Sequence, residues 1–327
     1  MNKLYPLKFK PLFKDKIWGG DKIKTVMNMD FSPLPNCGEA WVLSGVEENE
    51  TEILNGWLAG NDLNEIVEIY MGDLVGEKIF LKFGNEFPIL VKFIDANDWL
   101  SIQVHPDDEL AARRNEGMGK TEMWYILQAD DGAELISGFS KKVDKEEYLK
   151  HLENKTLKSI LNFEEVKSGD VFYIPAGRVH ALGPGILLAE IQQTSDTTYR
   201  IYDWDRIDAA GFTRELHTEL AVDAIDYNVY KDYKTTYENK LNETVKLVDS
   251  PYFITNLIHL TKPLKKDYSE LDSFVIYLCV EGGFELKYDE ESIDISKGEA
   301  LLIPAVFEEV RIYPDKESKI LEVYMMM

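Results

Sequence analysis

The chain is poor in cysteine, in positive charge and in long apolar runs. Its 327 residues include two cysteines, Cys37 and Cys279, which are far apart and lack the Cys-x-x-Cys spacing of thiolate metal sites. This excludes a disulfide framework. No apolar run approaches the roughly 20 residues of a membrane span, and the N-terminus lacks the apolar core and cleavage pattern of a signal peptide. We therefore expect a cytoplasmic protein that has no membrane partner.

Basic residues are heavily outnumbered by acidic ones. The sequence has 36 Lys and Arg against 59 Asp and Glu, so its formal net charge at pH 7 is −23. This argues against nucleic acids and anionic membranes as partners, because both carry negative charge themselves. An anionic substrate would need a local cluster of Lys and Arg that overcomes the general repulsion. The remaining composition, 45% hydrophobic and 12% aromatic, is typical of a well-packed globular protein.

Short apolar runs rich in Ile, Val, Phe and Tyr recur along the chain, separated by Gly, Asp, Asn and Pro. Their length and spacing predict a mainly β protein of the sandwich or barrel type. The clearest runs are residues 87–94, 123–127, 171–174, 186–191, 253–260, 274–280, 300–303 and 320–324. Helices are expected at residues 61–70, 107–115, 144–161 and 213–222.

Three stretches carry residue types that bind divalent metals. Gln103 and His105 lie two apart in Ser-Ile-Gln-Val-His-Pro, so on a strand their side chains point to the same face. Glu122 follows Gly-Lys-Thr at the start of an apolar run, and His180 follows Ile-Pro-Ala-Gly-Arg-Val, a turn that presents the residues after it. Two imidazoles and one carboxylate suit a zinc-type ion, and three such ligands are the pattern of a catalytic site with an open position.

An internal repeat tests this hypothesis. Residues 167–176 (KSGDVFYIPA) match residues 296–305 (SKGEALLIPA), and residues 124–135 match residues 275–286. Two copies of one β unit are therefore expected, and the first is longer because residues 140–163 are inserted. On this alignment Ser273 stands opposite Glu122, and Glu309 stands opposite His180. Because the second copy lacks the ligand types, they favour chemistry in the first copy over a role in folding.

The order Gly-Asp, apolar run, Ile-Pro-Ala-Gly and His resembles the second motif of the cupins. The fuller set of segments resembles the type I mannose-6-phosphate isomerases in their short bacterial form, with Arg178 standing where a smaller residue is expected. The matching segments are residues 18–20, 38–41, 90–95, 100–108, 119–126, 175–182, 193–206 and 214–217.

Together with the repeat, the resemblance implies a mainly β fold of two cupin-type β-barrels (jelly-rolls) with a few inserted helices. Residues 1–225 would form the N-terminal catalytic cupin domain, with a helical insertion around 140–163. Residues 226–327 would form a C-terminal, metal-free cupin domain.

The resemblance also implies a function. The protein would be a metal-dependent aldose–ketose isomerase that interconverts mannose 6-phosphate and fructose 6-phosphate, with one zinc ion per chain. The metal ligands carry over onto Gln103, His105, Glu122 and His180. The catalytic arginine carries over onto Arg200.

The reaction removes a proton from carbon and passes through an enediolate, so negative charge develops on the sugar oxygens. A divalent ion and the permanently charged guanidinium of Arg200 would both stabilise that charge. Lys120 lies two residues before Glu122, hence on the same face of a strand, and is the expected base. A metal-bound water is the alternative base.

The substrate also needs contacts away from the reacting carbons. Lys92, Lys120 and Arg178 are the nearest cations for the phosphate, and Trp18 and Glu39 are expected to shape the pocket. Two other functions stay open: a different metal-dependent cupin enzyme, such as an iron oxygenase, and a non-catalytic sugar-phosphate-binding cupin. The first gives no reason for Arg200, and a binder would not need it. The sequence does not specify an oligomeric state.

Overall fold

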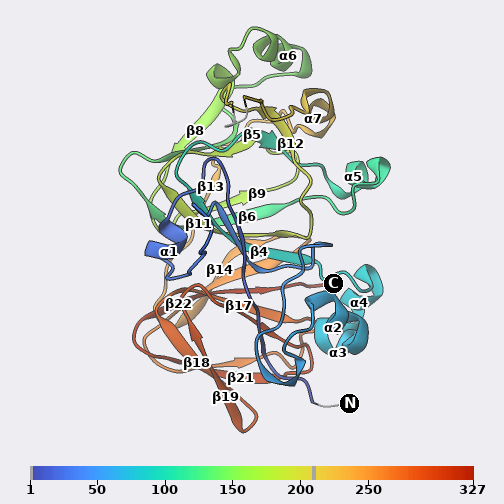
Figure 1. Ribbon diagram of the computed structural model, residues 1–327, viewed down its shortest axis with the longest axis vertical. Coiled ribbons are helices and arrows are strands. Elements are labelled where there is room, and N and C mark those ends of the chain that lie inside the picture. Colours follow the sequence, from blue (N-terminus) through green and yellow to red (C-terminus); the bar gives the residue numbers. More distant parts are fainter. Residues whose placement is uncertain (1–2, 208–210) are drawn as a thin grey trace.

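The computed structural model describes residues 3–207 and 211–327. In these residues the strands form four antiparallel sheets, which are arranged as two β units along the long axis of the molecule (Figure 1). The first unit fills the upper half of the view and the second unit, in orange and red, fills the lower half. The expectation of a mainly β cupin fold with inserted helices is confirmed, although each described sheet is open and none closes into a barrel.

The first unit contains a large and a small sheet that face each other. The large sheet has the order β13-β9-β6-β11-β4-β3-β2, and the small sheet has the order β12-β5-β10-β7-β8. The large-sheet strands are β2 (Leu12–Lys14), β3 (Glu39–Leu43), β4 (Ile89–Ala96), β6 (Glu122–Ala129), β9 (Val171–Ile174), β11 (Ile186–Gln193) and β13 (Lys234–Thr235). The small-sheet strands are β5 (Ile102–Val104), β7 (Glu134–Phe139), β8 (Leu161–Glu165), β10 (His180–Leu182) and β12 (Tyr199–Tyr202).

Central strands of the large sheet are buried on both faces, and each face packs into a different hydrophobic core. In β6, Met123 and Tyr125 join the core shared with the second unit, whereas Trp124 and Ile126 join the core inside the first unit. Side chains alternate along a strand, so Glu122 lies on the same face as Trp124 and points into the first unit. One face of β6 therefore directs Glu122 into the first unit, while the opposite face packs against the second unit.

The second unit repeats this arrangement. Its sheets have the orders β1-β20-β17-β22-β15-β14 and β16-β21-β18-β19. The strands are β1 (Leu7–Lys8), β14 (Glu243–Asp249), β15 (Ile254–Leu260), β16 (Leu264–Asp267), β17 (Val275–Glu281), β18 (Gly283–Tyr288), β19 (Glu291–Ser296), β20 (Ala300–Ile303), β21 (Glu309–Pro314) and β22 (Ser318–Tyr324). Because β1 pairs with β20, the start of the chain belongs to the second unit's sheet. The domain division at residue 225 stays a prediction, and β1 crosses it.

Strand pairing corrects the alignment of the two copies. Glu122 pairs with Ile174, and the matching Ile303 of the second copy pairs with Val275. Val275 therefore stands at the place of Glu122, two residues beyond the predicted Ser273. The sequence comparison missed this two-residue shift because it matched residues 124–135 to residues 275–286 without a gap. The expectation that the second copy has no carboxylate at this place is unchanged.

The expected helices are present, with shifted bounds for two of them. α2 (Leu63–Tyr70) and α5 (Asp108–Arg114) lie within the predicted ranges, and Asp107 caps α5 by accepting from the backbone N–H of Leu110. In the 140–163 segment, α6 (Lys145–Glu153) is followed by the 3-10 turn η2 (Leu157–Ile160). The remaining helical elements are α1 (Lys22–Thr25), η1 (Gly56–Leu58), α3 (Gly72–Val75), α4 (Glu77–Phe83) and α7 (Thr218–Ala224).

α7 begins five residues later than predicted, because Arg214, Glu215 and His217 are used in contacts with Asp203 and with Arg200 of β12 that are described below. In Figure 1, α6 and α7 lie at the far end of the first unit, and α2, α3 and α4 lie beside the second unit. Among the described residues, every helix is too short or too polar to cross a membrane.

Candidate active site

The predicted site residues come from both sheets of the first unit. Arg200 of β12 pairs with Gln103 of β5, which in turn pairs with His180 of β10. These three residues form one row across neighbouring strands and share one face of the small sheet. Glu122 begins β6 on the facing sheet, and His105 follows directly after β5.

His105, Glu122 and His180 converge in the interior. His105 Nε2 lies 3.5 Å from Glu122 Oε2, and His180 Nε2 lies 3.4 Å from Glu122 Oε1. One ligand atom from each residue can be chosen so that all lie within 4.8 Å of one another. All three side chains are buried. The structure therefore brings together the three residue types that the sequence pattern had grouped.

Both imidazoles are oriented by their other ring nitrogen. His105 Nδ1 lies 2.9 Å from the backbone oxygen of Thr197, and His180 Nδ1 lies 2.8 Å from that of Arg178. A carbonyl only accepts, so each Nδ1 carries the proton and each Nε2 presents a lone pair to Glu122. Burial lowers the pKa of both rings, to about 4 for His180, so they are neutral at pH 7. Neutral imidazole is the form that binds metals.

Glu122 has an unsatisfied oxygen. Its Oε2 is buried and has no hydrogen-bond partner among the described residues. Burial, and secondarily the charge of Glu190, raises the pKa of Glu122 to about 8. The negative charge of this buried carboxylate is not fully compensated by its neighbours, and two imidazole lone pairs face it. One carboxylate and two imidazole nitrogens together form a donor set that fits a divalent cation.

Gln103 and Lys120 complete this cluster. The Gln103 amide turns its nitrogen toward His180 Nε2, at 3.2 Å, while its oxygen accepts from the Ser101 hydroxyl. An amide that ligates a metal does so through oxygen, which requires half a turn of this side chain. The Lys120 ammonium is buried, 3.2 Å from His105 Nε2 and 3.6 Å from Glu122 Oε2.

A cavity of about 460 Å³ opens beside the cluster. Despite the acidic character of the whole protein, it is lined by cations as well as by carboxylates. The charged lining residues are Lys14, Lys16, Lys92, Lys120, Arg200 and Arg214, with Glu39, Glu190 and Asp196. Such a lining provides the local cation cluster that an anionic substrate needs.

Lys92 and Glu190 form a buried ion pair in this lining. Lys92 Nζ lies 2.8 Å from Glu190 Oε1, and the indole N–H of Trp124 donates to Glu190 Oε2 over 2.8 Å. Burial alone would raise the pKa of Glu190, but the ammonium groups of Lys92 and Lys120 outweigh it and lower that pKa. Glu190 is therefore an ionised carboxylate held at the wall of the cavity.

Trp18 and Glu39 also lie in the lining, as expected for residues that shape a pocket. Trp18 is buried, and the carboxylate of Glu39 accepts from the indole of Trp41 over 2.7 Å. Burial alone would raise the pKa of Glu39, but Lys92 and Lys16 hold it at about 2. The charge of Glu39 is thus fixed at any pH near neutrality.

Arg200 reaches the cavity from the edge of the small sheet. Its Nη1 donates to the backbone oxygen of Glu215 over 2.8 Å. Its Nε is buried and has no hydrogen-bond partner within the described ranges. Burial, together with the charge of Arg214, lowers the pKa of Arg200, and a guanidinium remains charged at neutral pH. Arg200 therefore brings a charged guanidinium to the cavity wall.

The structure does not bring Arg178 to the cavity. Its guanidinium lies over the rings of Tyr230 and Tyr233, at 4.5 and 4.7 Å from their centroids, and Nη1 donates to the Ser137 hydroxyl. The predicted role of Arg178 in substrate binding is not carried forward. Its backbone oxygen, which orients His180, is the part that serves the site.

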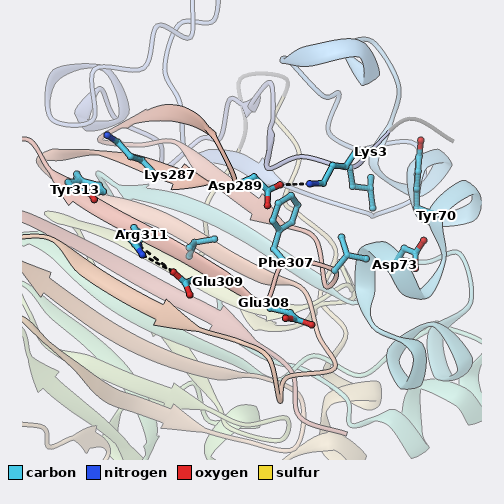
Figure 2. A pocket seen from close by; sticks show the side chains of 13 residues that line it. Lys3, Tyr70, Asp73, Lys287, Asp289, Phe307, Glu308, Glu309, Arg311 and Tyr313 are labelled. Carbon is cyan, nitrogen blue, oxygen red and sulfur yellow. Dashed lines mark hydrogen bonds and ion pairs between the residues drawn. The ribbon is translucent and has the colours of Figure 1, made fainter.

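A larger cavity lies in the second unit and lacks these features. It measures about 840 Å³ and spans the outer face of β18 and β21 up to Tyr70 and Asp73 (Figure 2). Charged groups there pair with each other, as Lys3 does with Asp289 and Arg311 with Glu309. The candidate metal cluster found among the described residues lies in the first unit instead.

Sequence reasoning missed Glu190, Asp203 and Arg214. Glu190 stands in the middle of β11, whose residues are all buried, and a carboxylate inside such a run was a usable signal. Arg214 lines the cavity and is paired with the buried carboxylate of Asp203 through two hydrogen bonds, one of 2.7 Å from Nε. Asp203 directly follows β12 and Arg214 lies in the loop before α7, so no local sequence pattern predicts that they pair.

Comparisons with known proteins agree with this geometry. Residues 6–138 match the phosphomannose isomerase type I catalytic domain, and residues 243–318 match the mannose-6-phosphate isomerase cupin domain. The chain is 35% identical over 308 residues to the mannose-6-phosphate isomerase ManA of Bacillus subtilis, covering 91% of this chain and 93% of that protein. It is 34% identical over 300 residues to the mannose-6-phosphate isomerase of Streptococcus mutans, covering 91% and 92%.

A solved structure gives the same result. The mannose 6-phosphate isomerase from Bacillus subtilis superposes with a TM-score of 0.87 and 32% identity, over 98% of this chain and 99% of that chain. Sequence similarity and fold therefore extend over nearly the full length, including the segments that carry His105, Glu122 and His180. The chain belongs to the type I phosphomannose isomerase family.

Proposed function

We propose that this protein is an aldose–ketose isomerase that interconverts mannose 6-phosphate and fructose 6-phosphate. The observation that carries the proposal is the row Arg200–Gln103–His180, which lines a cavity rich in cations and whose His180 lies 3.4 Å from the buried Glu122. The names of the relatives supply the substrate. The site supplies groups that suit an anionic sugar and an anionic intermediate.

The proposed metal ligands are Gln103, His105, Glu122 and His180. Two nitrogens, a carboxylate and an amide oxygen suit zinc better than a hard, oxygen-preferring cation, so we propose zinc as the ion. When bound, the ion would polarise and orient the sugar oxygens as a Lewis acid. Glu122 Oε2, which has no hydrogen-bond partner among the described residues, and the Nε2 lone pairs that the two histidines turn toward Glu122 support this assignment.

Arg200 would meet the charge that develops on the sugar during the reaction. Proton removal from the carbon next to the carbonyl leaves an enediolate, and a guanidinium retains its positive charge throughout that step. Arg200 lines the cavity, which supports this role.

Lys120 is the proposed proton carrier. As the neutral amine, the form that can accept a proton, it would take the proton from one sugar carbon; as the resulting ammonium it would return a proton to the neighbouring carbon, which converts the aldose to the ketose. Glu190 is the competing candidate, because it is an ionised carboxylate in the same cavity. The salt bridge between Lys92 and Glu190, with Trp18 and Glu39 nearby, would bind and orient the sugar.

We retain the cytoplasm as the proposed compartment. Cys37 and Cys279 are both buried and free, as expected where thiols stay reduced.

The purified protein tests the function directly. Its zinc, iron and manganese contents are measured, and mannose 6-phosphate is then supplied with and without a chelator. We expect fructose 6-phosphate to form, its formation to stop after chelation, and zinc to restore it. Oxygen uptake without isomerisation would instead indicate an oxygenase, and sugar-phosphate binding without turnover would indicate a binding protein; either result contradicts the proposal.

A further inference from the structure

A single residue closes the sheet edge beside Arg200. β12 is the outermost strand of its sheet, so the backbone groups on its outer side face no neighbouring strand there. The backbone N–H of Arg200 donates to Nδ1 of His217 over 3.2 Å, and the backbone N–H of His217 donates to the Arg200 oxygen over 2.7 Å. These two bonds imitate the reciprocal pair of an antiparallel ladder, with an imidazole nitrogen in place of a carbonyl oxygen.

His217 is itself firmly placed. It is the residue directly before α7, and its backbone oxygen accepts from the N–H of Ala221 over 2.9 Å. Ala221 of α7 belongs to the same hydrophobic cluster as Tyr199 and Ile201, the two neighbours of Arg200 in β12. Because the helix packs on the strand, its first turn sets the position of the imidazole.

The same segment also contacts the other end of the arginine. Glu215, two residues before His217, accepts from Arg200 Nη1 over 2.8 Å through its backbone oxygen. Residues 215–217 therefore hold Arg200 at both its backbone and its guanidinium. If the hydrogen bond from the Arg200 N–H to His217 Nδ1 were lost, the strand edge at Arg200 could shift relative to the segment that holds the guanidinium.

We propose that His217 is a positioning residue for Arg200, acting through the acceptor lone pair of Nδ1. The inference rests on the proposed isomerase function, in which Arg200 meets the charge of the intermediate. A displacement of about 1 Å in such a group costs on the order of 100-fold in rate. The role requires an acceptor at Nδ1 and makes no demand on Nε2.

Three variants of His217 separate this role from simple packing. His217→Ala removes the acceptor and should lower kcat by roughly 10- to 100-fold, with little change in KM or metal content. His217→Asn places its amide oxygen where Nδ1 stood and should recover most of the loss. His217→Gln extends its amide one carbon further and should not. His151→Ala, which changes a histidine of α6 outside the cavity lining, is the matched control.

Hydrogen exchange at the Arg200 amide provides a readout that does not depend on activity. The amide should exchange faster in His217→Ala than in the parent chain, because its acceptor is gone, and the rate should return toward the parent value in His217→Asn. Combining His217→Ala with Arg200→Ala should cost no more activity than Arg200→Ala alone, since both changes act through the same group.

Full activity in His217→Ala, or equal losses in the Asn and Gln variants, would refute the positioning role. An additive loss in the double variant would refute it as well. These outcomes differ from a failure of the proposed function, in which the parent chain itself would show no isomerisation. In that case an unchanged exchange rate at Arg200 in His217→Ala would still refute the hydrogen-bonding role.

Discussion

His105 and His180 reach Glu122 from separate segments. The ring of His105 is oriented by the backbone oxygen of the distant Thr197, and the ring of His180 by that of Arg178, two residues before it. Side chains held in this way lose little further freedom when they take up an ion. The two imidazole donors are therefore in place before a ligand arrives, whereas Gln103 has to turn its amide, and removing one imidazole should affect occupancy directly.

His105→Ala should lower metal occupancy and abolish isomerisation. The variant keeps Glu122 and His180 but leaves two of the three clustered donors, too few for a tight site. Metal content after dialysis and turnover of mannose 6-phosphate measure the effect. His259→Ala, in the second unit, serves as the control and should keep both properties. A metal-free His105→Ala protein with full activity would contradict the assignment.

Arg200→Ala should keep its metal and its fold while losing turnover. A preorganised donor that acts on developing charge is worth roughly 100- to 1,000-fold in kcat. Arg200→Lys should also lose most of its turnover, because a lysine cannot reproduce the planar guanidinium and its fixed set of donors. Turnover near the parent value in the alanine variant would show that Arg200 is structural.

At this scale the sequence predicted what strand geometry places locally. The spacing of Gln103 and His105 predicted a shared face, and in the structure both side chains lie beside the ring of His180. Arg178 shows the limit of such prediction. Tyr230 and Tyr233, which surround it, come from a segment more than 50 residues later in the chain, and no periodicity indicates that two tyrosine rings will hold that guanidinium.

At the scale of secondary-structure elements, β4 carries a buried carboxylate, Asp95, that is not part of the candidate metal cluster. Asp95 Oδ2 accepts from the backbone N–H of Lys22 over 2.6 Å, while Oδ1 is buried without a hydrogen-bond partner among the described residues. Burial raises the pKa of Asp95 to about 6. A side chain added at Gly20 would meet this carboxylate at 2.5 Å, so the turn before α1 depends on a close approach.

The pKa of Asp95 predicts a specific pH dependence of stability. The folded state holds this proton more tightly than the unfolded chain, so the stabilisation is complete below about pH 4 and is lost as the pH rises through about 6. Asp95→Asn keeps an acceptor for Lys22 and removes the charge. It should therefore raise the free energy of unfolding at pH 7 by on the order of 2 kcal/mol.

Urea unfolding of both proteins at pH 4 and pH 7 measures that difference. The gain from Asp95→Asn should be large at pH 7 and near zero at pH 4. A gain that is the same at both pH values would mean that the charge of Asp95 is not responsible.

The helix at residues 213–222 shows why element bounds were harder to predict than element type. Thr213 offered a suitable N-cap, yet the helix starts at Thr218. The backbone oxygen of Glu215 and the ring of His217 are used by Arg200, and Arg214 is used by Asp203. Local propensity placed a helix here, and tertiary contacts decided where it could begin.

On the scale of the whole molecule, segments from the N-terminal half of the chain pair with and pack against the second unit. β1 pairs with β20, and Phe87 lies against Phe274 with ring centroids 4.6 Å apart. The backbone N–H of Ala305 donates to the oxygen of Leu74 in α3. The repeat in the sequence announced two similar halves, but nothing in it indicated that the start of the chain would complete the second one.

Expressing residues 226–327 alone tests how far the predicted division holds. The fragment lacks β1 and α2–α4, so its sheet edge at β20 and apolar surface around Phe274 would be exposed. We expect it to bind hydrophobic dyes and to unfold without a sharp transition. Near-ultraviolet circular dichroism and thermal denaturation measure this. A fragment that unfolds cooperatively would instead support an independent domain beginning at residue 226.

The row Arg200–Gln103–His180 makes catalysis depend on how three short strands are aligned. A strand that slides by one position presents its opposite face. If β12 did so, Tyr199 or Ile201 would face the cavity and Arg200 would face away, while most backbone pairing survived. A chain misassembled in this way could remain compact and retain its metal donors yet be inert, so turnover per bound ion is a sensitive measure of correct alignment in a preparation.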